Sequence, residues 1–180
     1  MELTIDNKPA GRVDIGLFGK NCPKNVNNIL HFIAKTNKNN SEIKQTYEGT
    51  NFFKIVPKFL IQGGDISCND GTGHLSVYNN EFVEDEISKN ITFCEAGLLA
   101  LANKGENTNG SQFFFTLDEN PKIDGKYTII GRVLKGYESL QKISFKCGSI
   151  QGDPLCDVKV AKTGIYSYEE YLKQKRSFYI

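Results

Sequence analysis

Two strand-like blocks about fifty residues apart, 52–65 and 107–115, hold the side chains best suited to contribute chemistry. They combine aromatic rings and amide side chains with one lysine, Lys54. Patterns for other chemistries are missing. The glycines near residues 71–73 match neither the P-loop nor the dinucleotide-binding pattern, and Ser111 follows a turn signal rather than standing in a G-x-S-x-G elbow. The two histidines lie at no metal-ligand spacing, so no metal site is indicated.

Together the two blocks resemble the signature segments of the cyclophilins, which are peptidyl-prolyl cis-trans isomerases that bind cyclosporin. The likeness runs from about Leu3 to Ile165, nearly the whole chain. Shorter matches support it at residues 11–13, 23–24, 71–73, 82–86, 124–126 and 131–133. Because these motifs are specific in combination, the sequence is identified as a member of this family.

The resemblance implies catalysis of rotation about Xaa-Pro bonds, in which no bond is made or broken. Unaided, this rotation faces a barrier of roughly 18–20 kcal/mol and takes tens to hundreds of seconds. A catalyst needs an apolar socket for the proline ring, polar groups that hold the flanking backbone, and a donor near the prolyl nitrogen. It acts by stabilising the twisted state more than either planar form. No cofactor and no metal are implied.

The family pattern assigns roles to particular residues of this chain. The catalytic residues that it implies are Lys54, Gln62, Asn103 and Phe114. The substrate-binding residues that it implies are Phe59, Leu60, Ala102, Gln112, Lys122, Ile123 and Tyr127. Taken alone, Phe59 and Phe114 would be interpreted as core residues of a β-protein. Their combination with the amide side chains of Gln62, Asn103 and Gln112 favours a proline-binding site.

Leu60 stands where a methionine is usual and Ile123 where a leucine is usual, and both keep an apolar wall. Three other positions depart from the family pattern in their chemistry. Lys54 stands where an arginine is usual, and it keeps the positive charge without the planar fork that holds two partners. Lys122 replaces a tryptophan that donates a hydrogen bond to cyclosporin, and Tyr127 replaces a histidine. We therefore expect a reduced rate, weak or absent cyclosporin binding and an altered substrate preference. A solvated strand lysine without a catalytic role is the alternative interpretation of Lys54.

Composition limits the class of protein and its partners. The 180 residues carry 22 basic and 21 acidic side chains, for a net charge of +1. This balance gives no basic field for nucleic acid and no attraction to a membrane surface, and no apolar run approaches the roughly 18–20 residues that span a bilayer. We expect a monomeric single domain whose partners are proline-containing peptides and proteins, with neither nucleic acid nor membrane.

The cysteines and the start of the chain bear on the compartment. The five cysteines are an odd number without a CxxC pair, which favours reduced thiols. A Cys147–Cys156 link is the alternative. The first residues lack the basic and apolar regions of a signal peptide. These observations predict a cytoplasmic or nuclear protein.

Local patterns predict the elements that position these side chains. Residues 12–17 alternate polar and apolar as in a half-buried strand. Pro23 begins an expected helix, with apolar residues Val26, Ile29, Leu30 and Ile33 on one face. A second helix is expected over 136–143. Further strands are expected at 51–56, 59–62, 97–103, 112–117, 127–133 and 158–162.

Many short strands separated by turns indicate a mainly β fold, either a sandwich or a barrel. The resemblance implies a closed antiparallel β-barrel of about eight strands, capped by two helices. We assign residues 1–166 to this isomerase domain. Residues 167–180 are expected to add a short C-terminal helix that begins with a capping box, Ser167 to Glu170. This helix would dock on the barrel or bind a partner.

The function predicted first is prolyl isomerisation that assists the folding of protein substrates. The alternative is a catalytically weak module that binds proline-containing segments in a larger complex such as the spliceosome. A scaffold with a closed socket is the third hypothesis.

Overall fold

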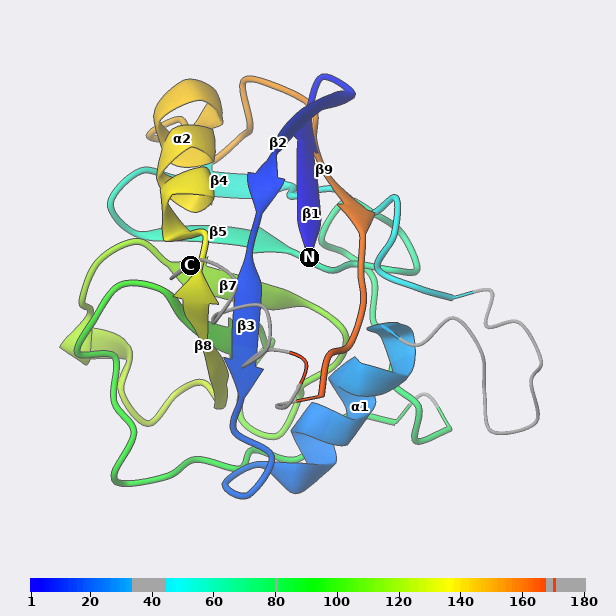
Figure 1. Cartoon of the computed structure of the whole chain (residues 1–180). Coiled ribbons are helices and arrows are strands. Elements are labelled where there is room, and N and C mark those ends of the chain that lie inside the picture. The colour runs from blue at the N-terminus through cyan, green and yellow to red at the C-terminus, as the bar shows by residue number, and fades with distance from the viewer. Residues whose placement is uncertain (34–44, 80, 168–169, 171–180) are drawn as a thin grey trace.

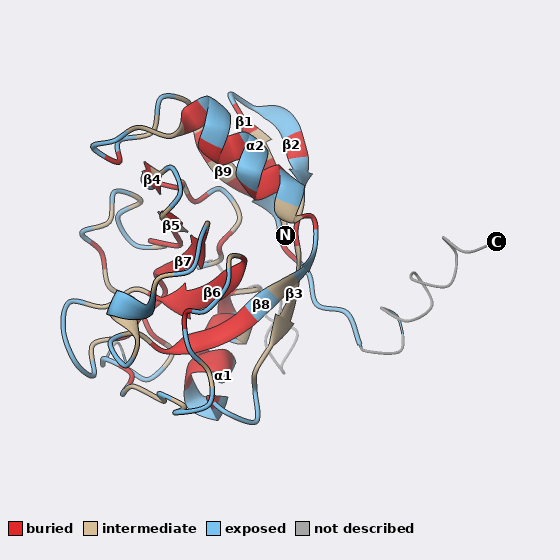
Figure 2. Cartoon of the chain, turned by 90° about the vertical axis from the view of Figure 1, so that its left-hand side faces the viewer, coloured by how far each residue is buried: buried red, intermediate tan, exposed pale blue. Residues whose placement is uncertain are grey.

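The computed structural model describes residues 1–33, 45–79, 81–167 and 170 (Figure 1). Two helices lie at opposite ends of the molecule with the strands between them (Figures 1 and 2), so the predicted mainly β fold with two helices is confirmed. The strands are β1 Glu2–Ile5, β2 Lys8–Arg12, β3 Asp14–Leu17, β4 Lys54–Val56, β5 Leu60–Gly63, β6 Leu98–Leu101, β7 Phe113–Thr116, β8 Ile129–Lys135 and β9 Val158–Lys162. The helices are α1 Pro23–Ile33, α2 Tyr137–Cys147 and a 3-10 turn, η1 Pro121–Ile123.

In the described part of the chain the strands form two antiparallel sheets, in the orders β2-β1-β9 and β3-β8-β6-β7-β5-β4. The prediction of one closed barrel is therefore not confirmed, because continuous pairing stops at two junctions. Between β2 and β3, Val13 leaves the ladder and exchanges backbone hydrogen bonds with Met1 at 2.8 and 3.0 Å. At the other junction, an isolated bridge between Asn51 and Lys159 and a few flanking backbone hydrogen bonds, such as Phe52 N–H to Val158 O at 2.8 Å, join the segment before β4 to β9 without a continuous ladder.

A hairpin of β1 and β2 was not predicted from the local pattern. Its two turn residues, Asp6 and Asn7, have φ angles of 50° and 60°, as a two-residue type I′ turn requires. Asp and Asn tolerate this left-handed conformation better than most residues. The turn brings Ile5 opposite Lys8 and sets the register of both strands.

Helix α1 has the bounds that Pro23 and the apolar spacing predict, and it also anchors a loop of the site. Val26, Ile29 and Phe32 are buried on its inner face. Asn28 is fully buried there as well, because its amide donates to Gly110 O (3.0 Å) and accepts from the Val77 N–H (2.9 Å). The amide therefore satisfies two backbone groups of loops that pack on the helix.

The core consists of two hydrophobic clusters, and the alternation of β7 divides its aromatic residues between them. Phe113 and Phe115 point into the larger cluster, and Phe114 points to the opposite side. The smaller cluster, called the Phe114 cluster below, contains Leu60, Phe93, Leu98, Ala100, Phe114 and Ile129. Figure 2 shows the strands of the larger sheet mostly buried between the helices.

All five cysteines are free thiols, so the alternative Cys147–Cys156 link is not formed. Cys22 and Cys147 are buried, whereas Cys68 and Cys94 are exposed. Burial, followed by the charge of Glu86, raises the pKa of the Cys22 thiol to about 12. This buried thiol donates to Phe18 O at 3.2 Å.

The predicted capping box is present in its two reciprocal hydrogen bonds. The Glu170 N–H donates to Ser167 Oγ (3.2 Å), and the Ser167 N–H donates to Glu170 Oε2 (2.7 Å). The rest of the expected C-terminal helix lies outside the described residues, so its extent stays a prediction.

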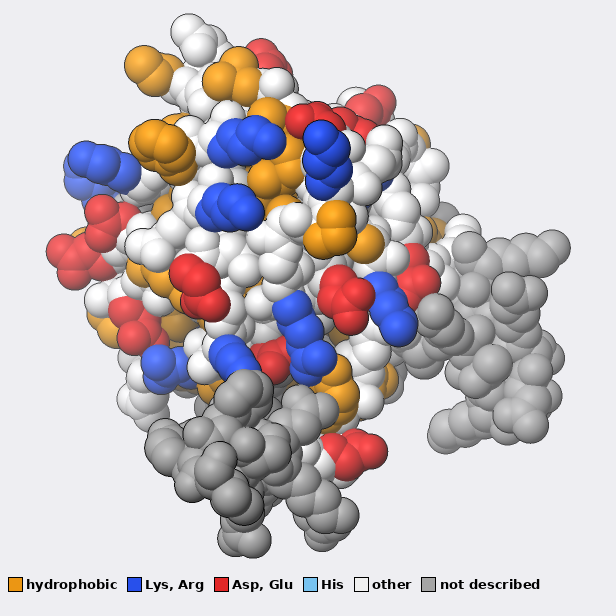
Figure 3. All heavy atoms as spheres, turned by 45° about the horizontal axis from the view of Figure 1, so that its top comes forward, with side chains coloured by type: hydrophobic (Ala, Val, Ile, Leu, Met, Phe, Trp, Pro, Cys, Tyr) orange, Lys and Arg blue, Asp and Glu red, His pale blue; other side chains and the backbone are white. Residues whose placement is uncertain are grey.

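The face of the molecule that carries α2 mixes apolar, basic and acidic side chains (Figure 3). Phe145 is 94% exposed and Ile150 is 91% exposed, and Leu155 is exposed nearby. Within the described residues, no helix combines the length and apolar character that crossing a membrane would require.

Candidate active site

Register in the larger sheet places the candidate catalytic residues in one row. Lys54 on β4 lies opposite Gln62 on β5, Gln62 lies opposite Phe114 on β7, and Phe114 lies opposite Ala100 on β6. Neighbouring strands are about 4.8 Å apart, so the row brings residues distant in sequence within a few strand widths of each other. The structure therefore brings together three of the four residues predicted to be catalytic.

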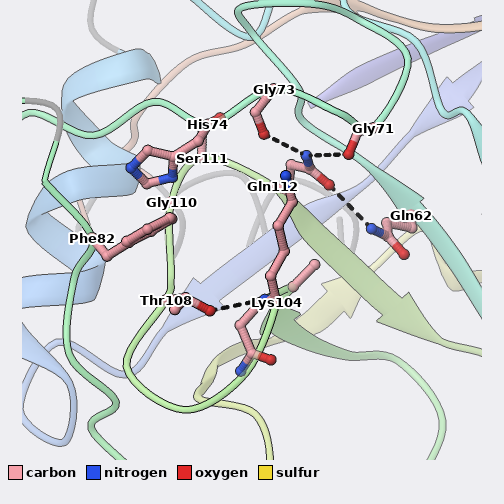
Figure 4. A pocket seen from close by; sticks show the side chains of 12 residues that line it. Gln62, Gly71, Gly73, His74, Phe82, Lys104, Thr108, Gly110, Ser111 and Gln112 are labelled. Atoms are coloured by element: carbon pink, nitrogen blue, oxygen red, sulfur yellow. Dashed lines mark hydrogen bonds between the residues drawn. The ribbon is translucent and has the colours of Figure 1, made fainter.

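Two glutamines connect this row to an adjacent loop through a chain of hydrogen bonds (Figure 4). Gln62 Nε2 donates to Gln112 Oε1 at 3.2 Å. Gln112 Nε2 in turn donates to Gly73 O (2.8 Å) and Gly71 O (3.0 Å). Gln112 is nearly buried and its amide is held at both ends, whereas Gln62 is half-buried and its carbonyl oxygen has no partner among the described residues. The arrangement orients Gln62 and leaves it an acceptor for a ligand.

These glutamines line a pocket of about 120 Å³. Ala102 and Asn103 also line it, so four of the predicted site residues share one hollow. On its far side, the rings of His74 and Phe82 contact each other at a tilt of 50°, with their centroids 4.0 Å apart. Lys104 also lines the pocket, and its ammonium donates to Thr72 O at 3.0 Å.

Asn103 links the pocket to the turn over residues 121–127. Its Nδ2 donates to Lys126 O at 2.9 Å, and the preceding residue, Ala102, donates its N–H to Gln112 O at 2.9 Å. The fourth predicted catalytic residue is therefore joined to the others through Gln112 and not through direct contact with Lys54.

The predicted socket residues meet in the Phe114 cluster. Leu60 and Phe114 are buried members, and the other four pack against it with partly exposed side chains, namely Phe59, Ala102, Ile123 and Tyr127. The rings of Phe114 and Tyr127 meet edge to face with centroids 5.3 Å apart. This partly exposed side of the cluster offers an apolar surface next to the glutamine chain.

Two predicted residues line neither the pocket nor the Phe114 cluster, although Lys54 lies in the same row as Gln62. Lys122 is exposed on η1. Lys54 is exposed at the start of β4, and its ammonium makes no hydrogen bond or ion pair with any residue that the structure describes. Both side chains are therefore free to meet a ligand.

A buried carboxylate that the sequence did not single out holds the loop on which Gln112 depends. Asp65 accepts the N–H groups of Gly71 (2.8 Å), Cys68 (2.9 Å), Gly73 (3.0 Å) and Asp70 (3.3 Å). Burial alone would raise the pKa of Asp65, but these backbone donors outweigh it and lower the pKa to about 2. The clustering of glycines after Asp65 is the only sequence signal of this role, because only the folded loop brings the donors together.

Comparison with known proteins now decides the family. The family model described as cyclophilin type peptidyl-prolyl cis-trans isomerase/CLD matches residues 1–165. The chain belongs to this family. The cyclophilin is 35% identical to a rhodopsin-specific peptidyl-prolyl cis-trans isomerase isozyme from Calliphora vicina, over 95% of this chain and 70% of the relative. It is also 35% identical to peptidyl-prolyl cis-trans isomerase B from Saccharomyces cerevisiae, over 93% of this chain and 79% of the relative.

A solved structure agrees with the fold of this cyclophilin. The crystal structure of a cyclophilin type peptidyl-prolyl cis-trans isomerase from Cryptosporidium parvum, obtained in the presence of the dipeptide Ala-Pro, superposes with a TM-score of 0.78. The sequences are 30% identical, and the match covers 93% of this chain and 99% of the other. The predicted family and its isomerase function are thereby confirmed.

Proposed function

We propose that this cyclophilin isomerises Xaa-Pro bonds with the proline ring on the exposed side of the Phe114 cluster. Gln62, Gln112 and Asn103 hold the flanking backbone, and Lys54 donates toward the prolyl nitrogen as the bond twists. The observation that carries this assignment is the proximity of the two groups: the glutamine pair and the apolar cluster meet at Phe114, which lies opposite Gln62. Neither a nucleophile nor a bound cofactor is needed, since the reaction is a rotation.

Gln62→Ala tests the proposal with little risk to the fold, because the side chain is half-buried and makes one hydrogen bond. We expect kcat/KM for an Xaa-Pro test peptide to fall about tenfold or more, since a group that holds the twisted substrate is removed. The measurement is the cis-to-trans rate, with thermal unfolding as the check on folding. Gln141→Ala, an exposed glutamine on α2, is the matched control. An unchanged rate in Gln62→Ala would contradict the assignment.

The site also leads us to propose weak cyclosporin binding, because Lys122 is an exposed cation where the family has a tryptophan. Lys122→Trp is expected to tighten cyclosporin binding about tenfold, by about 1.4 kcal/mol, since an aromatic face and an N–H donor are added. The natural sequence has no tryptophan, so the new indole also reports binding by fluorescence. Lys122→Phe adds an aromatic ring without an N–H donor, so its cyclosporin affinity separates the contribution of the ring from that of the hydrogen bond. Affinity unchanged in both variants would count against this role of position 122.

The second candidate function is a proline-binding module with negligible turnover, and the unpaired ammonium of Lys54 is the observation that favours it. A module of this kind retains the apolar cluster and the glutamine pair, so proline peptides bind while their isomerisation rate stays at the uncatalysed value. Peptide titration and rate measurements on the same sample distinguish the two functions.

We also propose a cytoplasmic or nuclear location for the protein. It is supported by the five free thiols, of which Cys68 and Cys94 are exposed. Thiols of this kind persist in reducing compartments.

A further inference from the structure

The turn formed by residues 149–152, between α2 and β9, pairs with the outer edge of β4. The Ser149 N–H donates to Ile55 O at 3.1 Å, and the Ile55 N–H donates to Gly152 O at 2.8 Å. Because β4 is an end strand of the larger sheet, this edge would otherwise lack a partner. The 149–152 turn is thus fixed to the backbone directly beside Lys54.

The same turn packs against the aliphatic stem of Lys54. A Cβ placed on Gly152 would lie 3.2 Å from Lys54 Cγ and 3.5 Å from Lys54 Cε. The lysine stem therefore runs closely along the glycine backbone from its base to near its ammonium. Gly152 has a φ of +98°, which side chains of L residues rarely adopt, so glycine suits this position for both conformation and space.

Ser149 closes the turn through both its side chain and its backbone. The Gly152 N–H donates to Ser149 Oγ at 2.9 Å and to Ser149 O at 3.2 Å. Ser149 and Gly152 are thus joined across the turn, and each is also hydrogen-bonded to Ile55. A local side-chain bond of this kind stabilises a turn without contributing to the core.

Lys54 needs such a restraint more than an arginine would. Its ammonium has no partner among the described residues, and its stem has several rotatable bonds. A lysine side chain carries about 2 kcal/mol of rotamer entropy and lacks the rigid fork that pre-organises arginine. Packing of the stem is therefore the contact that limits where the ammonium can lie.

We propose that the 149–152 turn positions Lys54 for catalysis and that Ser149 is a positioning residue for the isomerase reaction. The inference rests on the proposed role of Lys54 as the donor to the prolyl nitrogen. Ser149 itself touches neither substrate nor the reacting bond; it acts by keeping Gly152 against the lysine stem.

The experiment is a double-mutant cycle of Ser149→Ala and Lys54→Ala, with the cis-to-trans rate of an Xaa-Pro peptide as the readout. Ser149→Ala alone is expected to lower kcat about fivefold with little change in KM, a modest loss beside the roughly hundredfold cost of a 1 Å misplacement. Ser149→Thr retains the hydroxyl and is expected to retain the rate. In the Lys54→Ala background, Ser149→Ala is expected to have no further effect, because the positioned group is gone.

A matched control separates positioning from general loss of stability. Ser88 Oγ accepts the Asn90 N–H at 3.3 Å in a turn of another loop, so Ser88→Ala removes the same kind of bond outside the site. Its kcat is expected to be unchanged. As a readout independent of activity, NMR relaxation of the Lys54 side chain is expected to show greater mobility in Ser149→Ala than in the natural protein.

The outcomes distinguish this inference from the proposed function. If Lys54→Ala lowers the rate while Ser149→Ala is additive with it, the positioning role is overturned and the role of Lys54 stands. A fall of the rate in Ser149→Ala without a change in Lys54 mobility also overturns it. If Lys54→Ala leaves the rate unchanged while Gln62→Ala lowers it, both the donor role of Lys54 and the inference are lost, whereas the proline site stands.

Discussion

Lys54→Ala is expected to lower kcat/KM about 10- to 100-fold, and Lys54→Arg is expected to raise it about three- to tenfold. Removal of one well-placed donor to a transition state costs about 10²–10³ in rate, and a lysine, which lacks the planar fork of arginine, captures only part of that. The side chain of Lys54 is exposed and its ammonium makes no polar contact with described residues, so neither change should disturb the fold. The cis-to-trans rate of an Xaa-Pro peptide, measured for the three proteins side by side, checks both expectations.

Lys162→Ala is the matched control, because Lys162 is an exposed lysine at the end of β9 in the other sheet. Equal rates for Lys54→Ala and the natural protein would show that Lys54 is a solvated strand residue. A silent natural protein that gains activity in Lys54→Arg would show instead that the proline site is sound and that the lysine makes it a binding module.

Asp65→Asn is expected to destabilise the protein by about 3 kcal/mol, since a buried charged acceptor loses part of its set of backbone donors. Asp65 is fully buried and accepts four backbone N–H groups in addition to the Ser67 hydroxyl. Urea unfolding at pH 7 measures the loss. Asp153→Asn, an exposed carboxylate, is expected to leave stability unchanged. A similar stability for both variants would contradict the role given to Asp65.

The same carboxylate predicts a dependence of stability on pH. Its pKa is lowered from 3.8 to about 2 in the folded protein, so the folded state favours the charged form. The stabilisation is complete above the unfolded pKa and is lost as pH falls through the folded pKa, an interval from about pH 4 to pH 2. The contribution is about 2 kcal/mol. The difference in unfolding free energy between the natural protein and Asp65→Asn should therefore narrow over that interval.

Asp65→Asn also tests how the site is supported. The loop that Asp65 holds supplies the carbonyls of Gly71 and Gly73 to Gln112, which orients Gln62. We expect a lower isomerisation rate under conditions where the variant is still folded. A full rate in the folded variant would mean that Gln62 is positioned without this loop.

The elements predicted well from sequence are those whose signal is local. Helix α1 begins at Pro23 and carries the expected apolar face, and β9 has the expected bounds Val158–Lys162. The expected strand over 12–17 is instead interrupted at Val13, whose backbone pairs with Met1. Strand β2 was missed for a related reason. It contains Pro9 and Gly11, which are poor strand formers, and its pairing with β1 sustains it.

The residues of the candidate site could be predicted from sequence, whereas the groups that hold them in place could not. The family resemblance predicts which apolar residues gather, and Phe59, Ile123 and Tyr127 do pack against the Phe114 cluster. The groups that hold the site residues in place are harder to predict from sequence, because they are backbone groups of loops. The hydrogen bonds of Asp65, and those between Ser149 and Gly152, depend on φ angles and loop closure that no residue pattern specifies.

The pairing of the 149–152 turn with β4 has a consequence for solubility. An end strand with free N–H and C=O groups is a template for pairing with another chain. Ile55 has both groups occupied by Ser149 and Gly152, so this edge of the larger sheet is capped within the molecule. A protein with this turn shortened would present an open edge at β4. It would then aggregate through strand pairing between molecules, even if its hydrophobic core remained intact.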